Sequence, residues 1–400
     1  MGFLWIGAAA FLMFLIQGMV YSRYWDRGLQ AWLWFAQPAL REGEQGELKE
    51  VVENRKRMPL PVLHVNLQLN RSLVFASQEN TALSDQTYRR DVFSVLPYQR
   101  ITRTLPFTAA KRGYYPCREV ELVGRTLFFQ GPFVKKIPQQ AFLYVYPKAI
   151  SMELVRAACQ EMLGEYLWKK RLFEDPFSFQ GIRDYEPHDS FRQVNWKAYG
   201  RTGQLKVNVF EHTAMAKAEI LLNLKGDSIW TEEILLEGVI RMGAALAEQW
   251  IAMGVPVGLQ TNGRDLVSGA LVTVRSGAGS AHARTILQAL SRIDLSKTDF
   301  RQSKEACSRD RAAWDGADRK AASWRRRDAE PVWLSDWKNS ISGGMIFYVS
   351  CSEREEDVKQ IEAMRQRGAQ ILWVRPVISR VAEERKRIYK GPVMEWRVEE

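Results

Sequence analysis

The chain has 400 residues, of which 46% are hydrophobic and 26% are charged, and its formal net charge is +11. Folded domains usually hold ~100 to 200 residues, so this length and apolar content predict two folded domains and exclude a largely disordered chain. The positive charge suits a negatively charged partner. It does not distinguish anionic lipid from nucleic acid.

The cysteines and histidines form no recognisable site. The cysteines lie far apart and include no Cys-x-x-Cys pair, and no His-Glu-x-x-His motif is present. These spacings predict neither a zinc site nor a disulfide framework, and they indicate a reducing compartment. We therefore expect no metal and no cofactor. The cysteines are Cys117, Cys159, Cys307 and Cys351.

Residues 2–21 form an uncharged apolar segment at the N-terminus. About 20 helical residues at ~1.5 Å each span the ~30 Å hydrocarbon core of a bilayer, so residues 1–22 are predicted to be a transmembrane anchor in contact with membrane lipid. A cleaved signal peptide is the alternative, but the positive start and small-residue cleavage site that it needs are missing. Arg23 and Arg27 follow the span, which places the remaining chain in the cytoplasm of a single-pass cell membrane protein.

Residues 29–147 contain short apolar runs separated by turn residues, which predicts a β-sandwich of the immunoglobulin-like type. The alternation in residues 29–35 predicts its first strand, and Trp25 is expected at the level of the lipid headgroups. No catalytic pattern occurs in this region, so a spacer or docking module is expected. Further strands are predicted at residues 50–52, 62–69, 92–96, 103–107, 120–123 and 142–146.

The second half of the chain changes in pattern. Residues 148–212 contain a predicted helix, 152–170, followed by a dense motif, and residues 213–400 alternate between strands and helices. The predicted strands are 218–224, 255–260, 344–349 and 370–374, and the predicted helices are 232–253, where apolar residues recur at helical spacing, 281–293 and 355–367. This alternation predicts an α/β domain with a parallel sheet and helices on both of its faces. A charged stretch at residues 296–339 is interpreted as a solvated helical insertion. A partner-binding arm is the alternative, because the stretch contains tryptophan and arginine.

Residues 181–211 form the densest motif in the chain. Arginines and aspartates crowd into it, which predicts bidentate arginine–carboxylate pairs. Asp189 is predicted to cap a short helix reaching Trp196, which would place Arg192 and Trp196 on one face of that helix. Residues 206–210 alternate like a strand.

The motif resembles the signature of the domain of unknown function 58 family. The main matching residues are Arg183, Tyr185, Asp189, Arg192, Trp196 and Arg201. The chain departs from the family pattern at His188 and Gly200, and it has one apolar span where members usually show two. The resemblance implies an N-terminal membrane segment, a β-rich region and a C-terminal domain similar to von Willebrand factor type A domains.

Type A domains that bind a cation end their first strand in Asp-x-Ser-x-Ser, whose oxygens suit magnesium. The equivalent strand end in this chain carries Asn223, Lys225, Asp227 and Ser228. Asparagine replaces the charged ligand, and Lys225 brings a positive charge to the place of the first serine. We therefore predict a degenerate site without metal, with Asp227 and Ser228 as turn residues.

The resemblance also implies association with an ATPase of the MoxR type (an AAA+ ATPase) and with transglutaminase-like membrane proteins, in envelope-associated assembly or maturation. The expected function is that of a non-enzymatic scaffold. The signature residues are expected to lock the junction between the sandwich and the type A-like domain, with partner recognition as the alternative role.

Two other functions remain as alternatives. A hydrolase-like enzyme would use Asp184, His188 and Asp189 as acid–base groups in a cleft lined by Tyr185 and Trp196. Nucleic-acid binding through the basic runs 169–171 and 325–327 is the least favoured, because acidic residues interrupt the positive charge near the second run.

Overall fold

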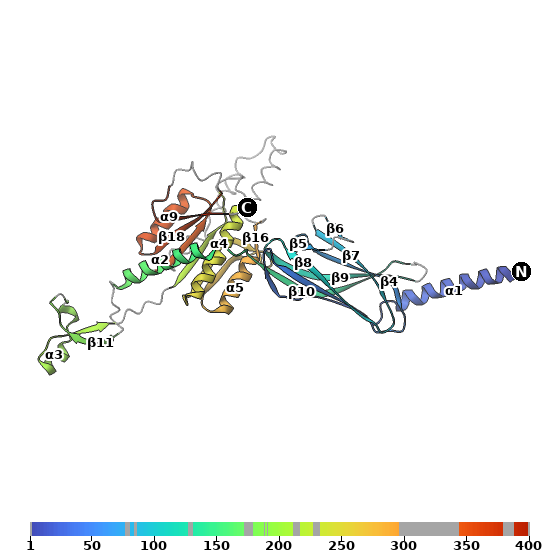
Figure 1. Cartoon of the computed structure of the whole chain (residues 1–400), viewed down its shortest axis with the longest axis horizontal. Coiled ribbons are helices and arrows are strands. Elements are labelled where there is room, and N and C mark those ends of the chain that lie inside the picture. Colours follow the sequence, from blue (N-terminus) through green and yellow to red (C-terminus); the bar gives the residue numbers. More distant parts are fainter. Residues whose placement is uncertain are drawn as a thin grey trace, which may run out of the picture. The chain divides into compact units, whose positions relative to one another are not determined.

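A computed structural model describes residues 2–76, 81–83, 86–126, 131–171, 179–187, 189, 191–210, 217–226, 233–295, 344–378 and 388–398. The chain divides into two compact units, shown by sequence colour in Figure 1. The first is Met1–Ala149 with Leu290–Arg292, and the second is Ile150–Ala289 with Ile293–Glu400. The predicted insertion at residues 296–339 lies outside the described residues.

The first unit begins with helix α1 (Gly2–Tyr24), and Trp5–Tyr24 within it is long and apolar enough to cross a membrane, a property that signal sequences share. The Trp25 side chain does not contact lipid, as the predicted interfacial anchor would, because it is only 5% exposed and belongs to the sandwich core. Its ring lies 6.1 Å from that of Phe133 and covers Gly124, where a Cβ atom would lie 2.7 Å from the indole. Burial of this large ring is more favourable than its exposure.

Two sheets form the β-sandwich. The order in the four-stranded sheet is β1-β3-β8-β5, and that in the six-stranded sheet is β2-β10-β9-β4-β7-β6. The strands are β1 (Leu29–Phe35), β2 (Ala39–Arg41), β3 (Gln45–Asn54), β4 (Leu60–Asn70), β5 (Leu73–Phe75), β6 (Thr81–Leu83), β7 (Gln86–Val95), β8 (Arg100–Ala109), β9 (Gly113–Arg125) and β10 (Phe133–Tyr146). Neighbouring strands are antiparallel except β2 and β10, which run parallel.

Strand β1 shows how the sequence pattern builds the sandwich. Leu29, Leu33 and Phe35 point into the core, whereas Trp32 and Trp34 are exposed on the opposite face. This two-residue alternation is the one that residues 29–35 predict. The strand therefore buries its leucines and Phe35 and leaves its tryptophans outside.

The interior of the sandwich contains a cluster of charged residues. Arg89 forms a bidentate pair with Asp91, at 2.7 and 3.2 Å, and Arg103 donates to the same carboxylate at 2.8 Å. Glu50 lies between the fully buried Leu48 and Val52 of β3 and is itself only 1% exposed. Burial first, and the nearby Asp91 second, raise the pKa of Glu50 to about 8 against the opposing effects of Arg103 and Arg89. A carboxyl group is thus kept protonated inside this domain at neutral pH.

The second unit is built on a seven-stranded sheet whose main order is β15-β14-β13-β17-β18-β19, with β16 paired to β14. Strands β14, β13, β17, β18 and β19 run parallel, and β15 and β16 are antiparallel to β14. The strands are β13 (Ala218–Asn223), β14 (Val257–Asp265), β15 (Leu271–Gly277), β16 (Ile293–Asp294), β17 (Met345–Ser350), β18 (Gln370–Val377) and β19 (Val393–Arg397).

Helices cover both faces of this sheet. The longer helices of this unit are α2 (Met152–Arg171), α4 (Glu233–Ala252), α5 (Ser280–Ser291) and α9 (Glu355–Gln366). Trp250 of α4 packs against Phe347 of β17, with ring centroids 5.4 Å apart. The next residue, Tyr348, shares a core cluster with Val358 and Ile361 of α9. Because consecutive strand residues point to opposite faces, α4 and α9 lie on opposite sides of the sheet.

Candidate functional site

The signature motif forms a small structure of its own, here called the signature module (residues 179–210). Strands β11 (Phe179–Asp184) and β12 (Lys206–Phe210) pair antiparallel, and between them lie the 3-10 turn η1 (Phe191–Gln193) and helix α3 (Trp196–Thr202). Val194 forms an isolated bridge with Val207, and both side chains are buried. This bridge fixes the turn and the helix to the hairpin.

The prediction that Asp189 caps a short helix reaching Trp196 is wrong. The residue that caps α3 is Asn195, whose Oδ1 accepts from the amide of Ala198 at 2.9 Å. Its Nδ2 donates to Asn208 Oδ1 at 2.8 Å, which ties the cap to β12. The bridge at Val194 interrupts the expected helix, so Arg192 and Trp196 do not lie on one helical face.

Asp189 instead binds Arg183. The Nη1 of Arg183 lies 2.6 Å from Asp189 Oδ2, and its Nη2 donates to the other carboxylate oxygen. The amide of Glu186 also donates to Asp189 Oδ2, at 2.8 Å. This bidentate pair closes the 184–189 turn with the geometry that arginine and carboxylate favour, as the sequence predicts.

Large aromatic side chains lie on the surface of the module. Trp196 is 61% exposed and Phe191 is 65% exposed, and α3 has no buried residue. The rings of Trp196 and Tyr199 meet edge to face at 6.2 Å, and those of Tyr185 and Phe191 lie 5.7 Å apart. Phe191 and Tyr199 were missed by the sequence interpretation, although their aromatic character beside a predicted short helix was a usable signal.

The module surface is also basic. Arg192, Lys197 and Arg201 are exposed on the same turn and helix as the aromatic residues. The structure therefore brings Arg183 and Asp189 together, and it places Arg192, Trp196 and Arg201 on the exposed surface of the module. Arginine beside exposed aromatic rings is the composition that protein interfaces favour.

A second candidate region lies at the carboxyl ends of the parallel strands. The chain passes from β13 to β14 on one side and from β17 to β18 on the other, so β13 and β17 flank the point where the strand order reverses. Ligands of open α/β sheets bind outside the strand ends at such a point. The predicted degenerate metal position, Asn223, ends β13 there.

Asn223 is buried and its side chain is fully engaged with protein groups. Its Nδ2 donates to Tyr348 Oη at 2.8 Å and to Asp357 Oδ2 at 3.1 Å. Its Oδ1 accepts from Asn262 Nδ2 at 2.8 Å and from the amide of Lys225 at 3.0 Å. The amide thus joins β13 to β14, β17 and α9. The sequence interpretation missed Tyr348, Asn262 and Asp357, because they are distant in the chain.

The surroundings of Asn223 are unfavourable for a cation. Arg354 donates to the carbonyl oxygen of Gly226, and its charge and that of Lys225 both act on Asp357. Burial nevertheless raises the pKa of Asp357 above its usual value, with Arg354 and Lys225 opposing the rise. The described residues include no group of three or more His, Cys, Asp or Glu side chains that would hold a metal. Asp227 and Ser228 lie outside the described residues.

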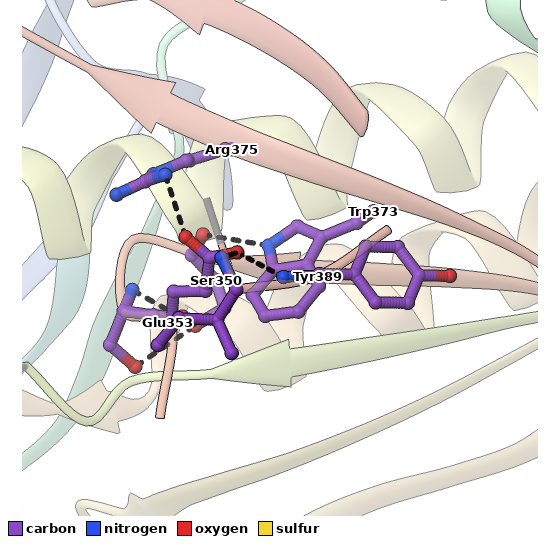
Figure 2. A network of polar contacts seen from close by, with 7 residues as sticks. Ser350, Glu353, Trp373, Arg375 and Tyr389 are labelled. Carbon is purple, nitrogen blue, oxygen red and sulfur yellow. Dashed lines mark hydrogen bonds and ion pairs between the residues drawn. The ribbon is translucent and has the colours of Figure 1, made fainter. Parts of the chain in front are cut away.

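A neighbouring polar network closes the end of the sheet (Figure 2). Glu353 pairs with Arg375 at 3.2 Å, and both side chains are buried. The other Glu353 oxygen accepts from the amides of Ile388 and Tyr389 at 2.9 and 2.7 Å. The Tyr389 ring lies 5.2 Å from that of Trp373, whose Nε1 donates to the carbonyl of Ser350. This network holds the 388–389 segment over β18.

No family model and no curated protein matches this chain. Among solved structures, a CARDB domain from Pyrococcus furiosus is 13% identical, with 29% of this chain and 93% of that chain covered at a TM-score of 0.19. A non-cellulosomal cohesin from Archaeoglobus fulgidus is 7% identical, with coverages of 32% and 97% and a TM-score of 0.20. TM-scores this low assign neither a fold family nor a function.

Proposed function

We propose that the chain is a membrane-anchored, non-enzymatic scaffold related to the domain of unknown function 58 family, and that it binds a protein partner through the signature module. The observation that carries the proposal is the exposure of Trp196 and Phe191 on a turn and a helix that the Val194–Val207 bridge fixes to the hairpin. Large exposed aromatic side chains on a rigid framework lose little entropy on binding and supply much of the energy at interfaces.

The positive charge of the module indicates the charge expected on its partner. Arg192, Lys197 and Arg201 are exposed beside the aromatic rings, so a partner with an acidic rim around an apolar patch is complementary to them. The family resemblance nominates an AAA+ ATPase of the MoxR type as that partner, together with a transglutaminase-like membrane protein in the same assembly. The positive residues after α1 support a cytoplasmic position for the module.

The hydrolase alternative is less well supported. Asp189 is held by Arg183 and the Glu186 amide, and Asp184 lies 3.3 Å from Lys206 Nζ with most of its side chain in solvent. Carboxylates in these two settings act as structural and surface groups rather than as an acid–base pair. His188 lies outside the described residues, as do the side chains of the basic runs 169–171 and 325–327 that nucleic-acid binding would use.

Trp196→Ala is expected to lower partner capture at least about ten-fold while the melting temperature stays unchanged, because the indole contacts solvent and its loss removes only an interface anchor. The full chain, solubilised from membranes, is used as bait and the recovered ATPase is quantified. Trp34→Ala is the matched control, since it removes an exposed indole from β1 of the other unit. Failure of the wild type to recover an ATPase, or equal recovery by Trp196→Ala, would contradict the proposal.

Magnesium is expected to leave the thermal stability of the wild type unchanged, because Lys225 and the engaged Asn223 amide disfavour a cation at the end of β13. A bound ion at 100 times its dissociation constant would add about 2.7 kcal/mol. Melting curves of chelator-treated protein, with and without magnesium chloride, measure the effect. A reproducible rise in melting temperature with magnesium would show that the site is not degenerate.

A further inference from the structure

The end of α1 is built into the sandwich. Tyr21 is 3% exposed, its hydroxyl donates to the carbonyl of Pro59 at 3.1 Å, and its ring lies 6.2 Å from that of Phe133. Lys56 Nζ donates to the carbonyl oxygen of Trp25, just beyond the last turn of the helix. A cation at this position satisfies a terminal carbonyl and complements the helix dipole. No flexible linker separates the apolar helix from the domain.

These contacts fix the position of the 55–59 loop relative to the end of the apolar span. Tyr21 lies within the apolar span Trp5–Tyr24, ~4.5 Å before its end at ~1.5 Å per residue. Because the Tyr21 hydroxyl contacts Pro59, the loop must lie beside the last turn of the span. If α1 crosses a bilayer, residues 55–59 therefore reach the headgroup region.

A second loop is attached to the first. The Nδ2 of Asn54 donates to the carbonyls of Met58 and Leu96, at 2.9 and 3.0 Å, and the amide of Tyr98 donates to the carbonyl of Lys56 at 3.3 Å. Leu96 and Tyr98 are nevertheless exposed, Tyr98 by 67%. Tyr98 also has a φ of 58°, a left-handed conformation that is costly for a bulky residue. The loop thus holds an aromatic and an aliphatic side chain in solvent beside the end of α1.

Basic residues surround these two apolar side chains. Arg23, Arg27, Arg55 and Arg57 are exposed at this end of the sandwich. Two acidic groups lie nearby. Asp26 pairs with Lys135 at 3.4 Å, and Glu53 pairs with Arg100 at 3.2 Å and with Arg55 at 2.8 Å, so Arg55 shares its charge with Glu53. Aromatic side chains beside arginines are typical of protein at a membrane interface, where each basic residue near anionic lipid contributes about 1 kcal/mol.

We propose that this end of the sandwich is a membrane face that binds the headgroups of anionic lipids. The membrane face consists of Arg23, Arg27, Arg55, Arg57, Leu96 and Tyr98. Its arginines contact lipid phosphates, and Leu96 and Tyr98 enter the boundary between headgroups and acyl chains. The proposal rests on the membrane anchor of the proposed function, but it does not depend on the signature module or its partner.

The test uses hydrogen exchange of the full chain in nanodiscs, made either of phosphatidylcholine alone or of phosphatidylcholine mixed with phosphatidylglycerol. We expect the amides of loops 55–59 and 96–99 to exchange at least about five-fold more slowly in the anionic discs. The double variant Arg55→Gln/Arg57→Gln is expected to lose this difference. Arg71→Gln is the matched control, because Arg71 follows the 11-residue strand β4 and lies ~36 Å along it from the first loop.

Two results would overturn the membrane face. One is equal exchange of the two loops in both kinds of disc, and the other is a slowing that persists in Arg55→Gln/Arg57→Gln. An intact mass showing that α1 is removed in the cell would overturn the anchor as well as the membrane face. Capture of the protein partner is measured separately with the Trp196→Ala variant, so failure of one proposal is distinguishable from failure of the other.

Discussion

In the Glu50→Gln variant we expect the fall in sandwich stability that the wild type shows as the pH rises from about 5 to 8 to disappear. Both carboxyl oxygens of Glu50 are buried and have no hydrogen-bond partner among the described residues. Burial, reinforced by Asp91, raises the pKa of Glu50 from 4.5 to about 8. Glutamine keeps the shape of the protonated side chain and cannot ionise.

The fall of wild-type stability with rising pH follows from the linkage between folding and proton binding. In the unfolded chain the Glu50 carboxyl ionises near 4.5, whereas in the folded chain it stays protonated up to about pH 8. Folding therefore takes up a proton between these values. The protonated Glu50 carboxyl makes its full contribution to the stability of the folded sandwich below pH 4.5, and this contribution is lost as the pH rises towards 8. At 1.36 kcal/mol per pKa unit the loss is on the order of 3 to 5 kcal/mol.

Hydrogen exchange of the β3 amides in the full chain, corrected for intrinsic rates, measures the opening free energy at several pH values. Glu47→Gln is the matched control, because Glu47 is exposed on the same strand and its replacement leaves the buried carboxyl in place. The variants are compared by their pH slopes, so a constant offset from the glutamine amide does not affect the result. Equal slopes in wild type and Glu50→Gln would show that Glu50 is ionised in the folded sandwich.

Local pattern was sufficient to predict most of the secondary structure. Period-two alternation located β1, and helical spacing of apolar residues located α4, which the structure gives as Glu233–Ala252. Strands β2, β5 and β6 have three residues each and were not predicted, because so short a run carries no periodic signal. Strand β19 was also missed, although its partner β18 was predicted.

The wrong predictions for Trp25 and Asp189 have a common physical cause. In both cases a contact with a residue that is not adjacent in the chain decided between two roles that the local sequence allowed. Trp25 fits a headgroup position by its distance from the apolar span, yet Gly124 leaves room for its ring in the sandwich core. Asp189 is a good cap by type, but Arg183 competes for its carboxylate, and the cap position falls to Asn195. Neither Gly124 nor Arg183 is adjacent to the residue whose role it determines.

The end of the parallel sheet shows the same limit for the candidate site. The sequence singled out Asn223 and Lys225 by comparison with a metal-binding pattern, and the structure does place both at the strand end. The partners of Asn223 come from β14, β17 and α9, more than thirty residues away in every case, as the 2.8 Å contact with Asn262 illustrates. No local pattern identifies such partners.

Asn223→Asp is expected to destabilise the second unit by about 3 kcal/mol at neutral pH. The substitution retains the oxygen that accepts from Asn262 and Lys225. It removes the Nδ2 group that donates hydrogen bonds to Tyr348 Oη and Asp357 Oδ2. Loss of donors to buried acceptors costs ~1 to 3 kcal/mol, and a new buried charge facing Asp357 adds to that cost. Lys225 is only half-buried and offsets part of it.

Urea unfolding of the full chain measures this loss of stability when it is followed through hydrogen exchange of the β13 and β17 amides. Asn70→Asp is the control. Asn70 is exposed and uses its side-chain oxygen as an acceptor for the Ser72 amide, at 2.9 Å, so aspartate can replace it without losing that bond. If Asn223→Asp were as stable as Asn70→Asp, the amide donors would not be holding the strand ends together. A cation, rather than the Asn223 amide, would then be the better explanation for the polar groups that converge there.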